Sequence, residues 1–432
     1  MKYSKRVLGI AIVAMFSVFM VACAGKKTQN SVSSQNSAVH ERVNTIEFMS
    51  TWGGVDSKAG CLKEIIAKFE SENSTIKISN QSIFGDEYLP TLKTRFASGN
   101  EPDVFGLWPG SDIKHLVKAN KLADLTDKLK QDRTWMDSFN QESFQYTTYG
   151  NRIYGIPFEL VFEGLFINRD LFDKYNVKIP ENYEELKTAI QTFRANGIIP
   201  IAYNSSAEGS YLYQNMVASL GGSKGIEESI VDGKINKYYI EAMKYVKELY
   251  DMKAFPKDAL ILNSNERNQL FFTKQAAMIV QGSWFIPYFD KYDKSVEMIP
   301  FPSMSDSSPK IPTGLGGGTF YISKSAWDTP TGENSTLIFL KYLTSKETAK
   351  YFYDKTALLT NLNIELETPY SYLAQKSLNL YENISEEDKT PIPDHVIERS
   401  IWNDIVIQQF PYYLEGKKTA EEIWEEAVEK MH

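Results

Sequence analysis

Cysteine and histidine are scarce in this sequence. Its 432 residues include two cysteines, Cys23 and Cys61, and four histidines scattered along the chain. No spacing of histidine, cysteine and acidic residues matches a transition-metal site, so we expect neither a metal centre nor a cofactor. Cys61 has apolar neighbours at helical spacing, which predicts a small core residue rather than a disulfide partner.

Basic residues are outnumbered by acidic ones, with 47 Lys and Arg against 55 Asp and Glu. The formal net charge is −8 at pH 7, which argues against nucleic acid as a partner and against an electrostatic contact with a membrane. No P-loop motif is present, which excludes ATP binding of that kind. Residues 42–432 exceed the ~250–300 residues that one hydrophobic core usually serves, and this length predicts two domains.

The N-terminus carries an apolar run of its own. Basic residues precede the apolar stretch 7–21, and together they predict an export signal over residues 1–22. The segment that ends at Cys23 resembles a lipoprotein box, in which cleavage leaves a lipid-modified cysteine; the alternative is an ordinary core cysteine. Residues 23–41 are polar and predict a flexible tether. The expected location is the extracellular face of the cytoplasmic membrane, reached through the lipid anchor alone.

The first part of the folded region alternates strands with helices. Apolar alternation predicts a strand at 45–51, and further strands open at 76 and 103. Helical spacing and capping residues predict helices at 56–72 and 86–99 between them. This order predicts a parallel or mixed sheet with covering helices.

A second informative stretch lies near the middle of the chain. The apolar run 276–280 predicts a strand buried on both faces. Gly282 follows, where the backbone can turn sharply and another group can approach closely. Trp284 then stands just past the strand end, where open α/β sheets bind ligands. The alternative is that Trp284 belongs to the core.

Several motifs in a fixed order resemble one family. Phe96-Ala-Ser-Gly-Asn-Glu-Pro-Asp-Val-Phe105 is similar to the Ser-Gly-x-x-Pro-Asp-Val segment of the family 1 solute-binding proteins of ABC importers, the multi-sugar and maltodextrin-binding group. Further matches occur at 122–127, 154–157, 168–172, 180–186, 272–284, 343–347 and 414–422. The chain departs from the family pattern at Asn182 and Tyr183, which replace Thr-Trp, and at Gln275, which replaces a glycine.

The resemblance implies an α/β fold of the periplasmic-binding-protein type. Two lobes would be joined by three hinge crossings and would close over a ligand cleft. The matched motifs place the crossings near residues 150–156, 298–303 and 344–348. The first lobe would then comprise 42–152 with 302–345, and the second 156–298 with 346–432.

The tryptophans are ranked by their position after strands and glycines. By this rule Trp52, Trp108 and Trp284 are expected in the cleft. The resemblance adds Trp402, which matches a late aromatic that lines the cleft in similar proteins. Those expected to be structural are Trp135, Trp327 and Trp424. An indole presents a flat face that suits the C–H side of a sugar ring, so the first group predicts a ligand of two or more rings.

Polar candidates complete the expected binding site. Glu159 and Glu163 would share one face of an extended chain and could accept sugar hydroxyl protons, although a solvated strand edge would show the same pattern. Asp86 and Glu87 could contact a ligand or serve only as helix caps. The resemblance adds the backbone at Gly316 and Gly317. It also adds Asn403, which follows Trp402 in the matched segment 400–404.

We therefore expect a monomeric, lipid-anchored receptor that passes a carbohydrate to the permease of an ABC importer. A receptor for a polyol or an acidic sugar is one alternative, and a surface sensor or adhesin is another. A secreted glycoside hydrolase is a third, but its paired carboxylates stand ~5–10 Å apart. Glu159 and Glu163 would lie ~13 Å apart along a strand. We accordingly expect no enzymatic activity.

Overall fold

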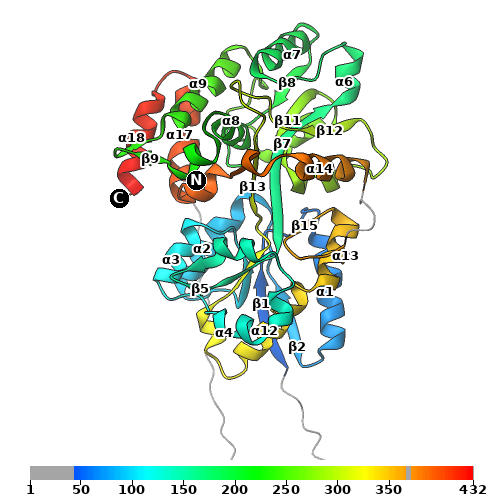
Figure 1. Cartoon of the computed structure of the whole chain (residues 1–432), viewed down its shortest axis with the longest axis vertical. Coiled ribbons are helices and arrows are strands. Elements are labelled where there is room, and N and C mark those ends of the chain that lie inside the picture. The colour runs from blue at the N-terminus through cyan, green and yellow to red at the C-terminus, as the bar shows by residue number, and fades with distance from the viewer. Residues whose placement is uncertain (1–42, 366–370, 432) are drawn as a thin grey trace, which may run out of the picture. The chain divides into compact units, whose positions relative to one another are not determined.

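The computed structural model describes residues 43–365 and 371–431. Within this part the chain forms two α/β lobes, each built around its own sheet (Figure 1). The predicted export signal, the lipidation site Cys23 and the tether lie outside the described residues, as does the side chain of Asp86. No described helix is both long and apolar enough to cross a bilayer.

The first lobe contains a five-stranded mixed sheet. Its strands, in spatial order, are β2 (Ile76–Asn80), β1 (Asn44–Met49), β3 (Val104–Gly106), β14 (Thr319–Ile322) and β6 (Gly155–Pro157). β1 pairs in parallel with both β2 and β3, whereas β14 runs antiparallel to β3 and β6. The predicted alternation of strands and helices at the start of this lobe is confirmed.

Helices cover this sheet through apolar stripes. They are α1 (Ala59–Glu72), α2 (Tyr88–Ser98), α3 (Ser111–Lys118), α4 (Thr126–Gln131), α5 (Arg133–Met136), α11 (Lys324–Trp327), α12 (Gly332–Leu343) and α13 (Lys346–Thr356). α1 buries one face at helical spacing, which includes Cys61. The prediction that Cys61 is a core residue is confirmed, and its thiol is free.

The second lobe is organised by one long strand, β7 (Glu159–Asn168). The seven-stranded sheet also contains β16 (Lys389–Pro391), β13 (Ile311–Leu315), β11 (Ala276–Gly282), β8 (Ile199–Ala202), β12 (Val296–Ile299) and β15 (Leu359–Thr360). β11 is buried at every residue, runs antiparallel to β7 and pairs in parallel with β8. The predicted strand at 276–280 is therefore confirmed as a central strand.

The helices of the second lobe supply most of the larger of its two hydrophobic clusters. They are α6 (Arg169–Lys174), α7 (Tyr183–Ala195), α8 (Tyr211–Glu227), α9 (Lys237–Asp251), α10 (Ser264–Phe272), α14 (Tyr372–Asn383), α15 (Pro393–Val396), α16 (Arg399–Ile401), α17 (Gln408–Leu414) and α18 (Ala420–Met431). α8, α9 and α18 pack together around Tyr239, Trp402 and Trp424. Short turns and hairpins connect these elements.

The strands place two of the crossings between lobes elsewhere than the sequence predicts. The first is at Phe158, between β6 and β7, close to the predicted position. The second passes through 316–318, between β13 and β14, and not through 298–303. The proline-rich segment there joins β12 to β13, and both pair with β7 because a strand of ten residues has room for several partners.

The third predicted crossing, at 344–348, is also displaced. α13 follows that point yet packs against α1, and its Phe352 lies in the core of the first lobe. The chain meets β7 again only at β15. A serine at 345 caps α13 through its side chain, so the segment that resembled a hinge is a break between two helices of one lobe.

Candidate functional site

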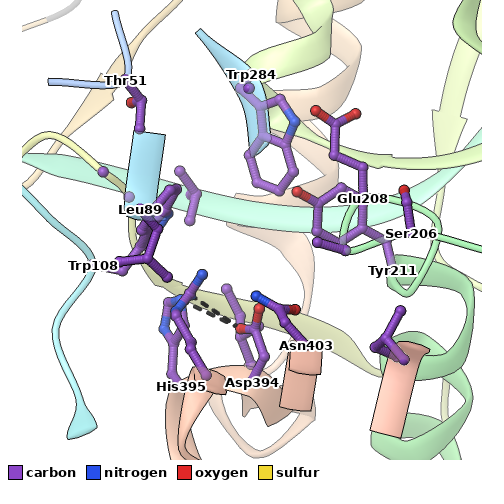
Figure 2. Close-up of a pocket in the computed structure, with 18 of the residues that line it drawn as sticks. Thr51, Leu89, Trp108, Ser206, Glu208, Tyr211, Trp284, Asp394, His395 and Asn403 are labelled. Atoms are coloured by element: carbon purple, nitrogen blue, oxygen red, sulfur yellow. Dashed lines mark hydrogen bonds and ion pairs between the residues drawn. The ribbon is translucent and has the colours of Figure 1, made fainter. Parts of the chain in front are cut away.

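A cavity of about 550 Å³ is lined by residues of both lobes (Figure 2). This volume lies within the ~300–1,000 Å³ of small-molecule sites. Thr51, Leu89 and Trp108 form one wall, opposite Trp284 and its neighbours. Thr51, Trp108 and Trp284 follow the carboxyl ends of β1, β3 and β11, where α/β sheets usually place ligands, whereas Leu89 belongs to α2.

Trp108 and Trp52 contribute to the cavity from the first lobe. Trp108 follows β3, is half-buried, and has the Arg399 guanidinium 4.5 Å from its ring centroid. Trp52 follows β1 and also lines the cavity, but it is only 1% exposed. Its ring packs against Phe158 and Phe320, so most of the Trp52 indole belongs to the core beneath the cavity.

Trp284 stands on the opposite wall, directly after β11. A Cβ atom at Gly282 would lie 2.1 Å from the Trp284 ring, so glycine is required for the ring to fold back over the strand. The indole N–H donates to Oε1 of Gln281 at 3.0 Å. Tyr211 contacts the ring edge-to-face, with centroids 5.2 Å apart. These contacts orient an aromatic platform that remains partly exposed to the cavity.

The face of β7 that carries Glu159, Val161 and Glu163 lines the cavity, as the period-two alternation predicts. A carboxylate oxygen of Glu159 accepts the Gly318 N–H at 2.8 Å, and its other oxygen lies 3.9 Å from Nζ of Lys58. Burial raises the pKa of Glu159, while the Lys58 ammonium and the Gly318 N–H act in the opposite direction. The carboxyl group thus has partners on one side and the cavity on the other.

Glu163 is more deeply buried and lacks a cation at contact distance within the described residues. It is 1% exposed and accepts a hydrogen bond from Nδ2 of Asn215 at 2.8 Å. Burial raises the pKa of Glu163 well above its usual value, and the nearby Asp394 carboxylate raises it further. Asp394 is itself paired with Arg399 at 3.2 Å. A protonated Glu163 can donate as well as accept, which suits a hydroxyl group.

The raised pKa of Glu163 predicts a pH dependence of stability. A carboxyl group with a raised folded-state pKa stabilises fully below its unfolded value of ~4.3, and this contribution is lost as pH rises through the folded pKa. We expect Glu163→Gln to make the fall in unfolding free energy shallower by up to ~1.4 kcal/mol per pH unit above that value. Urea unfolding from pH 5 to pH 7 measures this, and parallel profiles would contradict it.

Gly316 and Gly317 line the cavity at the second crossing. A Cβ atom at Gly316 would lie 2.2 Å from Oε2 of Glu159, and one at Gly317 would lie 2.9 Å from Oγ1 of Thr51. A side chain at Gly316 would displace the Glu159 carboxyl group, and one at Gly317 would displace Thr51. The glycines therefore keep backbone, rather than side chain, at the cavity surface.

The structure does not bring every predicted residue to the cavity. Trp402 is fully buried, stacks on Tyr213 with ring centroids 5.2 Å apart, and donates its indole N–H to Ser210. It faces the core of the second lobe, whereas the next residue, Asn403, lines the cavity. The expectation that Trp402 lines the cleft is therefore corrected. Glu87 is exposed and does not line the cavity, although the neighbouring Gly85 does.

The remaining tryptophans lie away from the cavity. Trp135 and Trp424 are buried, and Trp327 packs partly buried against the core of the first lobe. Sequence reasoning missed further lining residues, namely Thr51, Asp56, Lys58, Ser205, Ser206, Glu208, Tyr211, Asp394, His395 and Arg399. The serine loop follows β8, so the strand-end rule could have found it; nothing local marks Asp394 or Arg399. Among the described residues, no cluster of histidine, cysteine and acidic side chains could hold a metal ion.

Comparison with known proteins agrees with this geometry. The profile of one family, bacterial extracellular solute-binding protein, matches residues 57–350. The chain belongs to that family. The match includes β7, whose face lines the cavity, and β11, which Trp284 follows.

This solute-binding protein has relatives of known character. It is 24% identical over 369 residues to the multiple sugar-binding protein of Streptococcus mutans, covering 82% of each chain. It is 24% identical over 413 residues to the maltodextrin-binding protein MdxE of Bacillus subtilis, covering 91% of this chain and 89% of the relative. A solved structure from work on xylan utilization by Caldanaerobius polysaccharolyticus has the same fold, with a TM-score of 0.78 and 24% identity over 90% of this chain and 100% of the other.

Proposed function

We propose that this protein captures an oligosaccharide in the cavity and delivers it to the permease of an ABC importer. The carrying observation is that Trp108 and Trp284 line opposite walls of one cavity. The Glu159 and Glu163 side chains line the same cavity. Aromatic faces suit the C–H side of sugar rings, and carboxyl groups suit their hydroxyls. Curated relatives that bind multiple sugars and maltodextrin support the same ligand class.

In this proposal the two indoles hold separate rings of the ligand. Glu159 and Glu163 hydrogen-bond to hydroxyls, Asn403 contributes an amide, and the backbone at 316–317 lies against the ligand. Trp52 is almost entirely buried and packs behind the cavity surface against Phe158 and Phe320. The ligand contacts both lobes together only when they are close, so binding shifts the population toward a closed form.

We further propose that the mature protein is a monomer held at the outer face of the membrane by a lipid on Cys23. The apolar stretch before Cys23 and the polar tether after it support this arrangement. Fractionation of cells that express Cys23→Ser tests it. The variant should leave the membrane fraction, and retention there would contradict the anchor.

A melting screen tests the ligand class. Raffinose, stachyose, maltotriose and a xylo-oligosaccharide are compared with monosaccharides, a polyol and a uronic acid. A ligand at 100 times its dissociation constant should add ~2.7 kcal/mol to the unfolding free energy. We expect an oligosaccharide to raise the melting temperature and to be recovered intact. A response to the polyol or the uronic acid alone would favour a receptor for that solute. Cleavage of the sugar would favour a glycoside hydrolase.

A further inference from the structure

Arg267 is a buried cation just behind one wall of the cavity. It lies in α10, is 1% exposed, and is not itself a lining residue. Its Nη2 forms an ion pair at 2.8 Å with Oε2 of Glu208, whose side chain does line the cavity. Its Nη1 donates to Oδ1 of Asn204 at 3.3 Å. The guanidinium therefore connects α10 to the loop that follows β8.

A second set of contacts runs from the same guanidinium toward Trp284. Nε and Nη2 of Arg267 donate to Oδ1 of Asn268 at 3.1 and 2.8 Å. Nε2 of Gln281 donates to the same oxygen at 3.4 Å, and Oε1 of Gln281 accepts the Trp284 indole N–H at 3.0 Å. The side-chain amides of Asn268 and Gln281 thus connect Arg267 to the Trp284 ring through hydrogen bonds.

The loop after β8 has little freedom of its own. Nδ2 of Asn204 donates to Oγ of Ser206 at 2.9 Å and to the carbonyl of Leu262 at 3.1 Å. A Cβ atom at Gly209 would lie 1.6 Å from the carbonyl oxygen of Asn204, so the loop closes tightly on itself. Ser206, Glu208 and Tyr211 consequently lie beside Trp284 on the same wall of the cavity (Figure 2).

We propose that Arg267 is a positioning residue, which holds Glu208 and Trp284 in their binding orientation before ligand arrives. This inference rests on the proposed function, because the orientation matters only if the wall contacts ligand. A planar guanidinium with several fixed donors suits the role, since it can constrain a carboxylate and amides at once. Side chains that are already ordered lose less entropy on binding, which increases affinity.

The first test uses ligand-free protein. Indole N–H signals are recorded by ¹H–¹⁵N NMR for the native chain and for Arg267→Gln, Asn268→Ala and Arg169→Gln, with Trp284 assigned from Trp284→Phe. Arg169, which is more exposed and pairs with Glu297 at 3.1 Å in the same lobe, controls for the loss of an arginine ion pair away from the cavity. We expect the Trp284 signal to shift or broaden in the first two variants and to stay unchanged in the control.

The same spectra separate positioning from general damage. Trp402 and Trp424 belong to the same lobe and donate to Ser210 and Tyr213, so their signals should remain in place. If all three signals move in Arg267→Gln, Asn268→Ala decides, because it removes only the relay. A Trp284 signal that is unchanged in Asn268→Ala would overturn the inference.

The second test measures binding of raffinose and maltotriose by calorimetry and stopped flow. We expect Arg267→Gln to weaken binding by about tenfold or more, mainly through faster dissociation, with Arg169→Gln unchanged. Equal affinities in Arg267→Gln and the native chain would overturn the inference while the proposed function stands. If the native chain binds no sugar yet the Trp284 signal moves as expected, the proposed function fails and the structural link remains.

Discussion

Replacing Trp284 by alanine should weaken oligosaccharide binding by roughly 30-fold or more. Truncating an aromatic anchor at the centre of an interface typically costs ~2 kcal/mol or more, which is a factor of about 30 in the dissociation constant. We expect Trp284 to act as such an anchor, because Gln281 and Tyr211 hold its ring in place on one wall of the cavity. Titration calorimetry with the sugar identified by the melting screen measures the change.

Trp327→Ala provides the matched control. Trp327 is also a partly buried tryptophan, but it packs against the core of the first lobe and does not line the cavity. It should lose some stability and keep its affinity. Tight binding by Trp284→Ala would refute the assignment of this wall to the ligand.

Replacing Lys58 by methionine should lower the free energy of unfolding by ~3–5 kcal/mol, because it leaves the buried Glu159 and the partly buried Asp56 without their cation. Lys58 is 4% exposed and lies 3.4 Å from Asp56 and 3.9 Å from Glu159. Glu159 starts β7 in the second lobe, whereas Lys58 precedes α1 in the first. Both residues line the cavity, so the pair joins the two lobes there. Urea unfolding at pH 7 measures the loss.

Lys68→Met tests whether the burial of Lys58 is responsible. Lys68 lies on α1 and forms ion pairs with Glu72 and Glu347, but its side chain is 51% exposed. Exposed pairs contribute ~0–1 kcal/mol, so this variant should unfold almost as the native chain does. Equal losses in the two variants would show that burial of the charge is not the cause.

Local pattern predicted much of the fold and part of the site. Alternation along an extended chain places Glu159 and Glu163 on one face whatever surrounds them, and that face does line the cavity. The strand-end rule located Trp108 and Trp284 for a similar reason, since carboxyl ends of strands gather at one edge. The lobe boundaries were less accessible, because an irregular proline-rich segment does not reveal which sheet its next strand will join.

Local sequence patterns were enough to predict the first strands and helices, the shared face of Glu159 and Glu163, and a sharp turn with a close approach at Gly282. These follow from backbone geometry and steric exclusion within a few residues. Packing between distant segments is what turns Asn403 rather than Trp402 toward the cavity and brings Asp394 near Glu163. Burial and electrostatic environment depend on neighbours that are distant along the chain, and no local pattern encodes them.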